Sequence, residues 1–438
     1  MRLTMIGTGY VGLVSGACFS DFGHDVLCID KDKEKISSLS AGKVSIFEPS
    51  LERMVQENIS KKRLRFSSDI SDIKGAEIIF IAVGTPARRG DGHADLGYVF
   101  EALEEMVPHL QDGMTLVTKS TVPVGTAAKI EQFLAEKAKG IKLAVASNPE
   151  FMREGAAIRD FKLPDRIVIG TNSPHAMKQL EQAYRPLYLN KSPLFCTTPE
   201  TAELIKYASN AFLATKIGFI NEMSDLCEKL GADIQQLARA IGMDKRIGAK
   251  FLHPGPGFGG SCFPKDIIAL ERMGEEAGSL MPIVKKVRQR NEDRKTQMAE
   301  RIDKACGGVK GKKLAILGVT FKPNTDDMRE AASLTILPLL QKMGAEISVY
   351  DPQGKKEGEA LLKGVTWAKD EKHAAKGADA LIILTEWEAF RALNLKEIKA
   401  LLTTPLIIDL RNIYTLQEME ENGFSYHSLG RKVLKGGG

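Results

Sequence analysis

The chain has 438 residues, of which 43% are hydrophobic and 27% are charged, and its formal net charge at neutral pH is +5. This composition is that of a globular protein, and it argues against a disordered chain. Lys and Arg are interleaved with Asp and Glu, which argues against a nucleic-acid-binding surface, and the sequence has no apolar run long enough to span a membrane.

The six cysteines are scattered and form no C-x-x-C pair, so a zinc site or a dithiol redox centre is not expected. Scattered cysteines suit a reducing compartment, and the N-terminus runs into a glycine turn without a signal peptide. We therefore expect a cytoplasmic protein without a metal. One cysteine is a candidate nucleophile, and the other five are expected to be packing residues: Cys18, Cys28, Cys196, Cys227 and Cys306.

The first third of the chain alternates short apolar segments with segments of helical spacing. Such alternation predicts β-α-β units around a parallel sheet. The predicted strands are residues 3–6, 26–29, 78–83, 115–118 and 143–146.

A Gly-Thr-Gly-Tyr-Val-Gly segment at residues 7–12 follows the first predicted strand and opens a helix. In a dinucleotide site Gly7 permits the tight turn, Gly9 lets the backbone approach a pyrophosphate, and Gly12 allows close packing of helix and strand. Asp30 ends the second strand, at the spacing of an acid that binds the adenine ribose. An acid there favours NAD over NADP. The alternative is a glycine turn that binds no cofactor.

Two later strands end in polar loops that contain Thr85 and Thr121. Because ligands of open α/β sheets bind outside the carboxyl ends of the strands, both threonines are candidates for cofactor contact. Helix capping is the alternative role, and Thr121 could serve both.

The segment at residues 148–154 follows the next strand and contains Glu150 and Glu154. If the segment is helical, two residues four apart face the same way, and the pair could orient water or sugar hydroxyls or act in acid–base chemistry. A solvated pair is the alternative. We include the three intervening residues among the expected substrate contacts: Phe151, Met152 and Arg153.

A long helix is predicted to begin at Pro199 with Thr198 as its N-cap. Lys206 and Asn210 lie four apart on it among apolar residues, so that one face presents a cation and an amide. The lysine could stabilise an oxyanion, or it could be a surface lysine. More helix is predicted through about Gly242 and from residue 267 to about 306, and we expect this helical region to form a spine and a dimer interface.

The most informative segment, residues 256–266, places three glycines before Cys262 and places Lys265 and Asp266 after it. A nearby lysine favours the thiolate by lowering the cysteine pKa, and a thiolate can attack an aldehyde. The resulting thiohemiacetal can be oxidised to a thioester, which water hydrolyses. A dinucleotide fold with such a cysteine suggests a four-electron oxidation, whereas a buried packing cysteine is the alternative.

The last third returns to strand–helix alternation, with strands predicted at residues 314–317, 347–350, 381–384 and 406–410. It lacks a G-x-G-x-x-G segment, so we expect it to bind something other than a second NAD. Lys322, Arg329 and Arg411 are placed for phosphates or carboxylates. The glycine- and proline-rich loop at residues 251–255 is expected to grip a nucleotide.

The predicted fold class is α/β, with two Rossmann-like doubly wound parallel sheets joined by a central helical domain. The predicted boundaries place an NAD-binding domain at residues 1–197, a helical dimerisation domain at 198–308, and a second Rossmann-like domain at 309–438, for which the family resemblance described next implies UDP-sugar binding.

Together these segments, Gly-Gly-Ser-Cys-Phe-Pro-Lys-Asp at 259–266 above all, resemble the UDP-glucose and GDP-mannose dehydrogenase family, in particular its members that act on UDP-glucose. The resemblance runs from Gly7 to Asn412. It implies a dimer or a higher assembly of dimers, NAD as cofactor, UDP-glucose as substrate and UDP-glucuronate as product.

The resemblance also implies roles for single residues. The implied catalytic residues are Cys262, Lys206, Asp266, Thr121, Glu150, Glu154 and Asn210. The expected cofactor contacts are Gly7, Gly9, Tyr10, Val11, Gly12, Asp30, Lys35, Thr85, Thr121, Glu154, Lys265 and Arg329. The expected substrate contacts, beyond Glu150, Glu154, Lys206, Asn210 and the three residues named above, are Phe251, Leu252, His253, Pro254, Gly255, Gly259, Lys322, Arg411 and Arg246, the last reaching across the dimer interface.

Small departures from the family pattern include Phe258, where tyrosine is common, and a loop with Gly90 and His93. Three alternatives stay open: a sister enzyme for GDP-mannose or a UDP-N-acetylhexosamine, a two-electron β-hydroxyacid dehydrogenase, and a binding protein on an enzyme scaffold. N-acetyl members tend to carry histidine where Ser261 stands here, and a simple hydroxyacid enzyme has no use for Cys262.

Overall fold

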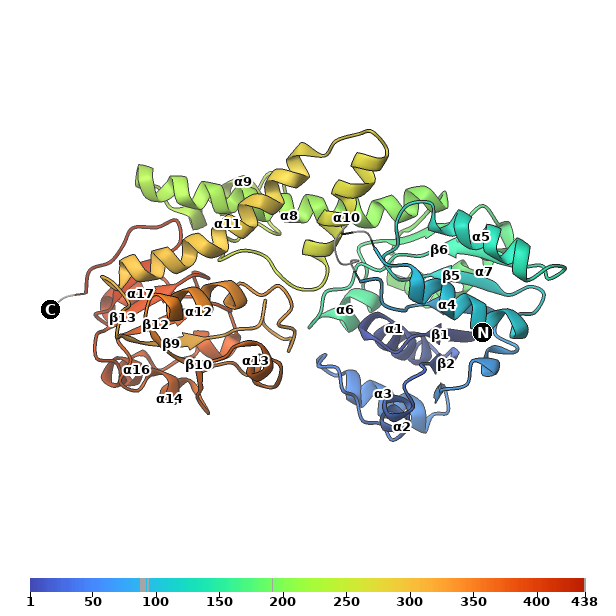
Figure 1. Ribbon diagram of the computed structural model, residues 1–438, viewed down its shortest axis with the longest axis horizontal. Coiled ribbons are helices and arrows are strands. Elements are labelled where there is room, and N and C mark those ends of the chain that lie inside the picture. Colours follow the sequence, from blue (N-terminus) through green and yellow to red (C-terminus); the bar gives the residue numbers. More distant parts are fainter. Residues whose placement is uncertain (87–91, 93, 191, 437–438) are drawn as a thin grey trace. The chain divides into compact units, whose positions relative to one another are not determined.

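The computed structural model describes residues 1–86, 92, 94–190 and 192–436, so Gly90 and His93 lie outside the described residues. The chain divides into two compact units (Figure 1). The N-terminal unit comprises Met1–Ser209 and Ile268–Ser279, and the C-terminal unit comprises Asn210–Ile267 and Leu280–Gly438.

The N-terminal unit is built on an eight-stranded sheet in the order β3-β2-β1-β4-β5-β6-β7-β8. Neighbouring strands pair in parallel except β6 and β7, which meet antiparallel at Ser147 and Gly170. The strands are β1 (Arg2–Ile6), β2 (Asp25–Ile29), β3 (Leu64–Ser67), β4 (Ile78–Ile81), β5 (Thr115–Thr118), β6 (Ala144–Ser147), β7 (Ile167–Gly170) and β8 (Leu194–Thr197).

Both faces of this sheet are covered. Ile78 and Phe80 pack into one hydrophobic cluster and Ile79 and Ile81 into another, because successive side chains of a strand point to opposite faces. The helices are α1 (Tyr10–Asp21), α2 (Lys33–Ser40), α3 (Leu51–Ser60), α4 (Gly97–Met106), α5 (Thr126–Lys137), α6 (Ala157–Lys162) and α7 (Pro174–Ala183), with short 3-10 turns η1 (Ile70–Ile73), η2 (Val107–His109) and η3 (Arg185–Asn190).

The C-terminal unit contains a six-stranded parallel sheet in the order β11-β10-β9-β12-β13-β14. Its strands are β9 (Lys313–Leu317), β10 (Glu346–Tyr350), β11 (Thr366–Trp367), β12 (Ala380–Ile383), β13 (Leu406–Asp409) and β14 (Ser425–Ser428). The helices packed around it are α12 (Ser333–Lys342), α13 (Lys355–Leu361), α14 (Glu371–Ala375), α15 (Glu388–Arg391), α16 (Leu395–Leu401) and α17 (Leu416–Glu421).

The helical region consists of α8 (Pro199–Leu230), α9 (Ile234–Gly242), α10 (Phe263–Glu276) and α11 (Pro282–Ala305). Pro199 is the first residue of α8, and the Thr198 hydroxyl accepts from the Thr201 amide at 3.3 Å, so the predicted N-cap is confirmed. The continuous helix predicted from 267 to 306 is wrong. Gly278 has a φ of 70° and α10 ends at Glu276, after which Pro282 opens α11 as a separate helix.

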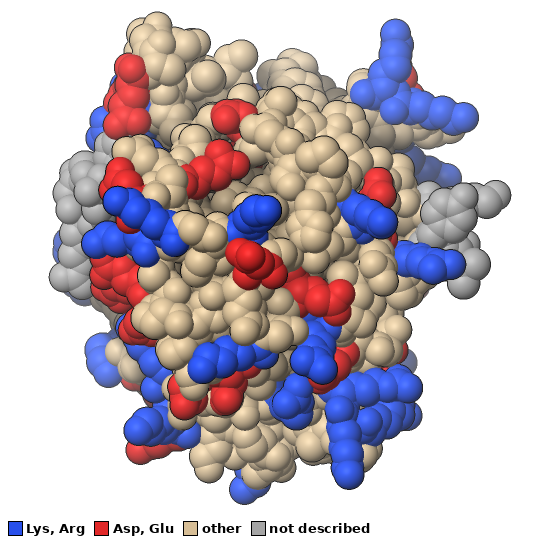
Figure 2. Space-filling model, turned by 90° about the vertical axis from the view of Figure 1, so that its right-hand side faces the viewer, with Lys and Arg blue, Asp and Glu red and all other residues tan. Residues whose placement is uncertain are grey.

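All nine predicted strands are present in the described structure, and the two-sheet α/β fold class is confirmed. The sequence patterns missed β3, β7, β8, β11 and β14, which are short or lie at sheet edges. Among the described residues no helix is long and apolar enough to cross a membrane. The face in Figure 2 shows acidic and basic side chains interspersed, with apolar and neutral surface between them.

Candidate active site

The glycine turn after β1 is shaped by two close backbone approaches. Gly7 has a φ of 96°, and its amide donates to the Ile29 carbonyl at 2.7 Å. A Cβ placed on Gly12 would lie 1.9 Å from the Gly7 carbonyl oxygen, whereas one on Gly9 would meet no protein atom within 4 Å. Gly9 precedes α1 and gives the helix no side-chain cap. The first turn of α1 therefore fits a pyrophosphate, as NAD binding requires.

Asp30 stands just beyond β2, next to this turn. Its Oδ2 accepts from the Thr8 amide at 2.9 Å, from the Thr8 hydroxyl at 2.7 Å and from Lys35 Nζ at 3.2 Å. Burial acts to raise the pKa of Asp30, but the hydrogen bonds from Thr8 and Asp32 and the charge of Lys35 bring it below the ordinary carboxyl value. An ionised acceptor at this position suits a ribose hydroxyl. Lys35, which is also expected to contact NAD, thus lies beside Asp30.

Tyr10 and Val11, both expected to contact NAD, point elsewhere with their side chains. Val11 packs against the hydrophobic core. The Tyr10 hydroxyl hydrogen-bonds to Glu48 and accepts from the Gly155 amide. Burial and the Glu48 carboxylate raise the pKa of Tyr10. The Tyr10 side chain thus ties α1 to the loop that holds Glu154.

Thr85 and Thr121 lie together at the carboxyl end of the first sheet. The Thr85 hydroxyl donates to the Thr121 carbonyl at 2.8 Å. The alternative role of Thr121 as a helix cap is wrong, because α5 begins after Gly125, which has a φ of 88° and gives no side-chain cap. Thr121 is half-buried rather than engaged at a helix end.

Lys206 and Glu150 form a buried ion pair in the N-terminal unit. Lys206 Nζ lies 2.9 Å from Glu150 Oε1, and the two side chains are 4% and 7% exposed. The surface-lysine alternative is therefore wrong. The Phe151 ring lies 5.4 Å from Lys206 Nζ and 3.7 Å from Arg166 Cζ, so two cations face one aromatic ring. A buried cation beside a carboxylate can hold charge or move a proton.

The segment from Glu150 to Glu154 is not helical, so the condition under which its two glutamates face one way is not met. The amide of Met152 donates to Glu150 Oε2 at 2.5 Å, and Arg153 pairs with Asp160 at 2.6 Å. Glu48, 107 residues earlier than Gly155, accepts the amides that open α6. Sequence reasoning missed Glu48 because no local pattern marks it.

Cys262 immediately precedes α10, where the helix N-terminus favours an anionic sulfur. Its carbonyl accepts from the Asp266 amide at 2.9 Å, and its Sγ lies 3.5 Å from the Ser261 hydroxyl. Asp266 is 1% exposed and accepts from Asn210 Nδ2 at 2.6 Å and from Lys265 Nζ at 2.5 Å. The C-terminal unit thus brings three of the predicted residues, Asn210, Lys265 and Asp266, into one hydrogen-bonded group at the start of the helix that the half-buried Cys262 precedes.

The loop at residues 251–255 is only partly available to a ligand. Phe251 has a φ of 65°, a strained conformation for a bulky residue, whereas the Leu252 side chain is buried in a hydrophobic cluster. His253 is exposed and Pro254 is buried. The Gly255 amide donates to Asn221 Oδ1 at 2.9 Å. Leu252 is therefore a packing residue in this structure, and any grip on a ligand falls to its neighbours.

Four predicted anion-binding residues are spread over the C-terminal unit. Arg411 Nε donates to the Leu384 carbonyl at 2.7 Å. Arg411 also lies close to Gly255, because a Cβ added to that glycine would stand 2.9 Å from Arg411 Nη1. Lys322 Nζ lies 5.1 Å from the Phe321 ring. Arg329 and Arg246 pair with Asp327 and Asp244, and the side chain of Arg246 is 89% exposed.

Lys119, which the sequence analysis did not single out, is buried one residue beyond β5. Its Nζ donates to Asn148 Oδ1 and to the Tyr184 hydroxyl, each at 3.1 Å. Burial lowers the pKa of Lys119 to about 8. Its place directly after a predicted strand was the available signal. Cys196 is a further correction: it is exposed on β8, at the sheet edge, whereas the other four cysteines expected to be packing residues are buried.

Comparison with known proteins shows to which family the chain belongs. The NAD binding domain of the UDP-glucose/GDP-mannose dehydrogenase family matches residues 1–188, its central domain matches 200–293, and its UDP binding domain matches 315–416. The chain belongs to the UDP-glucose/GDP-mannose dehydrogenase family. It is an NAD-dependent oxidoreductase by that membership.

Relatives in this family align over nearly the whole chain. A UDP-glucose 6-dehydrogenase of Rhizobium meliloti is 52% identical over 98% of this chain and 100% of its own, and the UDP-glucose 6-dehydrogenase TuaD of Bacillus subtilis is 44% identical over 99% and 94%. The structure of a UDP-glucose dehydrogenase from Pyrobaculum islandicum superposes with a TM-score of 0.88 at 38% identity, covering 95% of each chain. A UDP-D-ManNAc dehydrogenase structure from Pyrococcus horikoshii gives 0.85 at 27% identity, covering 98% of this chain and 99% of that one.

Proposed function

We propose that this protein oxidises UDP-glucose to UDP-glucuronate in two successive NAD-dependent steps that pass through a covalent intermediate on Cys262. The half-buried thiol at the N-terminus of α10, beside the buried Asn210–Asp266 pair, carries the proposal, because a two-electron dehydrogenase does not need it. Relatives up to 52% identical over the whole chain are UDP-glucose 6-dehydrogenases, which supports this sugar nucleotide as the substrate.

The chemistry begins at the sugar C6 alcohol, which the first oxidation converts to an aldehyde. The Cys262 thiolate then attacks the aldehyde carbon and forms a thiohemiacetal, the second oxidation converts this to a thioester, and water hydrolyses it to the carboxylate and the free thiol. When bound, NAD accepts the hydride in each oxidation, so one sugar yields two NADH.

The protein's own groups would handle the protons and charges. Lys206, held by Glu150 in a buried pair, can stabilise negative charge on the sugar oxygen. Asp266, oriented by Asn210 and Lys265, is the candidate to activate the hydrolytic water. Thr121 and Glu154 would contact the cofactor or hold water near the reacting carbon.

The remaining predicted contacts belong to the same proposal. The NAD-binding, helical and UDP-sugar-binding domains would divide at residues 197 and 308. Gly259, Lys322, Arg411 and the loop at 251–255 would bind the sugar nucleotide, and Lys265 and Arg329 would reach the NAD. Free cysteines at all six positions are compatible with a location in the cytoplasm.

A homodimer through α8 forms part of the proposal. Phe212, Phe219 and Leu226 recur every seven residues on one unbroken helix and are 66%, 48% and 44% exposed. A repeating apolar stripe on a long helix suits packing against the same helix of a second copy, because a two-fold interface uses the same patch twice. Replacing Phe219 by Glu should convert the dimer to a monomer in analytical ultracentrifugation. A Phe219→Glu variant that stays dimeric would place the interface elsewhere.

The experiment that tests the activity counts NADH formed per sugar consumed with UDP-glucose, GDP-mannose and UDP-N-acetylglucosamine in parallel. Two NADH per UDP-glucose, with little from the other sugars, is expected. Two NADH from a rival sugar would keep the mechanism and change the substrate, whereas one NADH per sugar would remove the covalent role of Cys262. Cys262→Ser should lower kcat at least about a thousandfold, whereas a two-electron hydroxyacid enzyme would hardly respond.

A further inference from the structure

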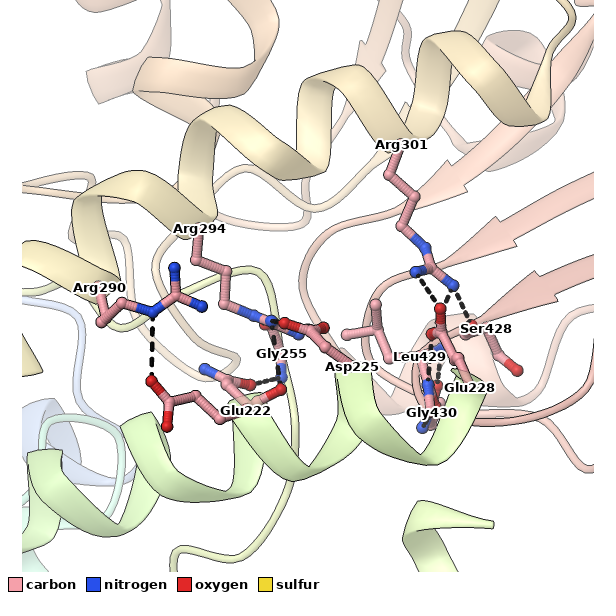
Figure 3. Close-up of polar contacts among 12 residues, drawn as sticks. Glu222, Asp225, Glu228, Gly255, Arg290, Arg294, Arg301, Ser428, Leu429 and Gly430 are labelled. Carbon is pink, nitrogen blue, oxygen red and sulfur yellow. Dashed lines mark hydrogen bonds and ion pairs between the residues drawn. The ribbon is translucent and has the colours of Figure 1, made fainter. Parts of the chain in front are cut away.

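The loop that carries Cys262 is fastened to α11 and to the second half of α8 by side chains that no part of the proposed chemistry uses. Figure 3 shows Arg294 reaching from α11 to Asp225 on α8 and to Gly255. The Arg294 Nε donates to the Gly255 carbonyl at 2.6 Å, while Asn221 of α8 accepts from the Gly255 amide at 2.9 Å. Both backbone groups of Gly255 are therefore engaged by buried side chains.

The two helices form a stiff support. Three ion pairs join α11 to α8 along their length, Arg290 to Glu222 at 3.2 Å, Arg294 to Asp225 at 3.0 Å and Arg301 to Glu228 at 2.8 Å (Figure 3). Arg294 is 4% exposed. A group attached to this support is held in place by packing as well as by its own bonds.

Asn291, one turn before Lys295 on α11, makes the central attachment. Its Oδ1 accepts from the Phe258 amide at 2.8 Å, and its Nδ2 donates to the Phe258 carbonyl at 3.0 Å. The carboxamide thus pairs with both backbone groups of one loop residue, as a neighbouring strand would. Asn291 is 5% exposed, so unmade bonds here would be costly. Few side chains other than a carboxamide offer a donor and an acceptor side by side.

The far side of the loop is held just as closely. The Gly260 amide donates to the Arg329 carbonyl at 2.8 Å, and a Cβ on Gly259 would stand 2.2 Å from the Glu330 carbonyl oxygen. Glu330 itself has a φ of 53°, a strained conformation that marks a constrained contact. Only three residues separate Phe258 from Cys262. Two anchors at so short a distance leave the thiol little freedom.

We propose that Asn291 is a positioning residue for the covalent step: by pairing with Phe258 it sets where the Cys262 thiol stands at the start of α10. The inference rests on the proposed role of Cys262 as the nucleophile. A nucleophile misplaced by about 1 Å can cost about a hundredfold in rate. Both polar ends of the Asn291 carboxamide bond to Phe258, so the loss of Asn291 should act on kcat rather than on the KM for NAD.

The first test compares Asn291→Leu with a matched variant, Asn58→Leu. Asn58 is a fully buried asparagine on α3, and its Nδ2 donates to the Met54 carbonyl at 2.9 Å. Both variants lose a buried carboxamide and should lower the Tm. Only Asn291→Leu should lower kcat, by about 10- to 100-fold, with the KM for NAD changed less than about twofold. The rate at which iodoacetamide alkylates Cys262, followed by mass spectrometry, should change in Asn291→Leu alone.

The second test uses Asn291→Asp, which also answers if the leucine variant folds poorly. A protonated carboxyl has an acceptor beside a donor and can repeat both bonds to Phe258, whereas the ionised form has no donor and repels the carbonyl. The kcat of Asn291→Asp relative to the native enzyme should therefore fall as the pH rises and the new carboxyl ionises. A ratio that is independent of pH, or an Asn291→Leu variant with native kcat and native alkylation rate, would overturn the proposal.

Cys262→Ser, assayed in the same series, separates a failure of the proposed function from a failure of the positioning role of Asn291. If that variant kept its activity, the proposed function would fail, yet the alkylation rates of Cys262 in the Asn291 variants would still report whether Asn291 positions the thiol. If Cys262→Ser is inactive and the Asn291 variants behave as the native protein, only the positioning role fails.

Discussion

The two sheets share the order of their first six strands, but the loop that follows β1 differs from the loop that follows β9. In the N-terminal sheet only Gly7, Thr8 and Gly9 separate β1 from α1, and the third glycine, Gly12, lies in the first turn of that helix. In the C-terminal sheet β9 ends at Leu317, and α12 does not begin until Ser333. Gly318 keeps the tight turn, with a φ of 84°, but Thr320 and Pro323 stand where the second and third glycines would be. The second loop cannot bring a helix N-terminus to a pyrophosphate in the same way.

Asp30 and Asp351, the acids that follow the second strand of each sheet, also differ. Asp30 is 17% exposed and accepts mainly from Thr8 and Lys35. Asp351 is 4% exposed and accepts from the amides of Val319, Thr320, Gln353 and Gly354 as well as from the Thr320 hydroxyl. An acid saturated by its own backbone closes a loop, whereas a partly exposed one can still accept from a ribose. Topology alone therefore does not make a dinucleotide site.

The largest effect should come from Gly12→Ala. Its Cβ would lie 1.9 Å from the Gly7 carbonyl oxygen, so the turn must open, at a cost of about 3–5 kcal/mol of stability and with loss of NAD binding. Gly9→Ala is the matched control, because its Cβ meets no protein atom within 4 Å. It should keep the native Tm and weaken NAD binding by at least about tenfold, measured by calorimetry. A Gly12→Ala variant with native stability would contradict the packing argument.

The paired variants Asp351→Asn and Asp30→Asn should separate structure from binding. Asp351→Asn should lower the free energy of unfolding by about 2–3 kcal/mol and leave the Kd for NAD unchanged, because one oxygen replaced by NH₂ leaves buried amides without an acceptor. Asp30→Asn should raise the Kd for NAD by about tenfold with less effect on stability. Equal losses of NAD affinity in the two variants would remove the distinction between the sheets.

Asp30 also predicts a pH effect. Since its folded pKa lies below the ordinary carboxyl value, its ionised form stabilises the fold at neutral pH, and that contribution is lost as the pH falls through the folded pKa. The acid sensitivity of Asp30→Asn, measured by thermal unfolding between pH 3 and pH 7, should be smaller than that of the native protein.

The smallest effect concerns Lys119, the residue that follows β5 in the N-terminal sheet. The residue at the equivalent place in the C-terminal sheet is the buried Leu410, which follows β13. The folded pKa of Lys119 is about 8, below the ordinary lysine value, so burying its charge opposes folding at neutral pH. The stability of the fold should therefore rise as the pH passes from about 8 toward the pKa of the unfolded lysine. Lys119→Met should stabilise the fold by about 1–2 kcal/mol at pH 7 in urea unfolding, because the Tyr184–Asn148 bond remains. The advantage should shrink at pH 10, and a destabilised variant at pH 7 would show that the charge is needed for packing.

Local patterns predicted much of this. The glycine turn, Asp30, the cysteine loop and the interior strands other than β7 were predictable because each depends on residues close together in the chain, whose periodicity and backbone freedom dictate the local conformation. The edge strands β3, β8, β11 and β14 were missed because they are partly exposed and lack the continuous buried apolar run of the interior strands. The condition that residues 150–154 be helical is not met, and the amides that open the following helix, α6, are bound by Glu48, about a hundred residues away, which no local pattern marks.

The sequence by itself determined the two-sheet α/β class, the NAD-type turn and the thiol that separates four-electron from two-electron chemistry, since these follow from residue types at fixed spacing. Only the tertiary structure decided that Lys206 is buried against Glu150, that Asp351 is saturated while Asp30 is not, and that Asn291 pairs with Phe258. The contacts of Lys206 with Glu150, of Asn291 with Phe258 and of Asp351 with Val319 each join residues more than 30 positions apart, and burial by the intervening chain gives them their strength.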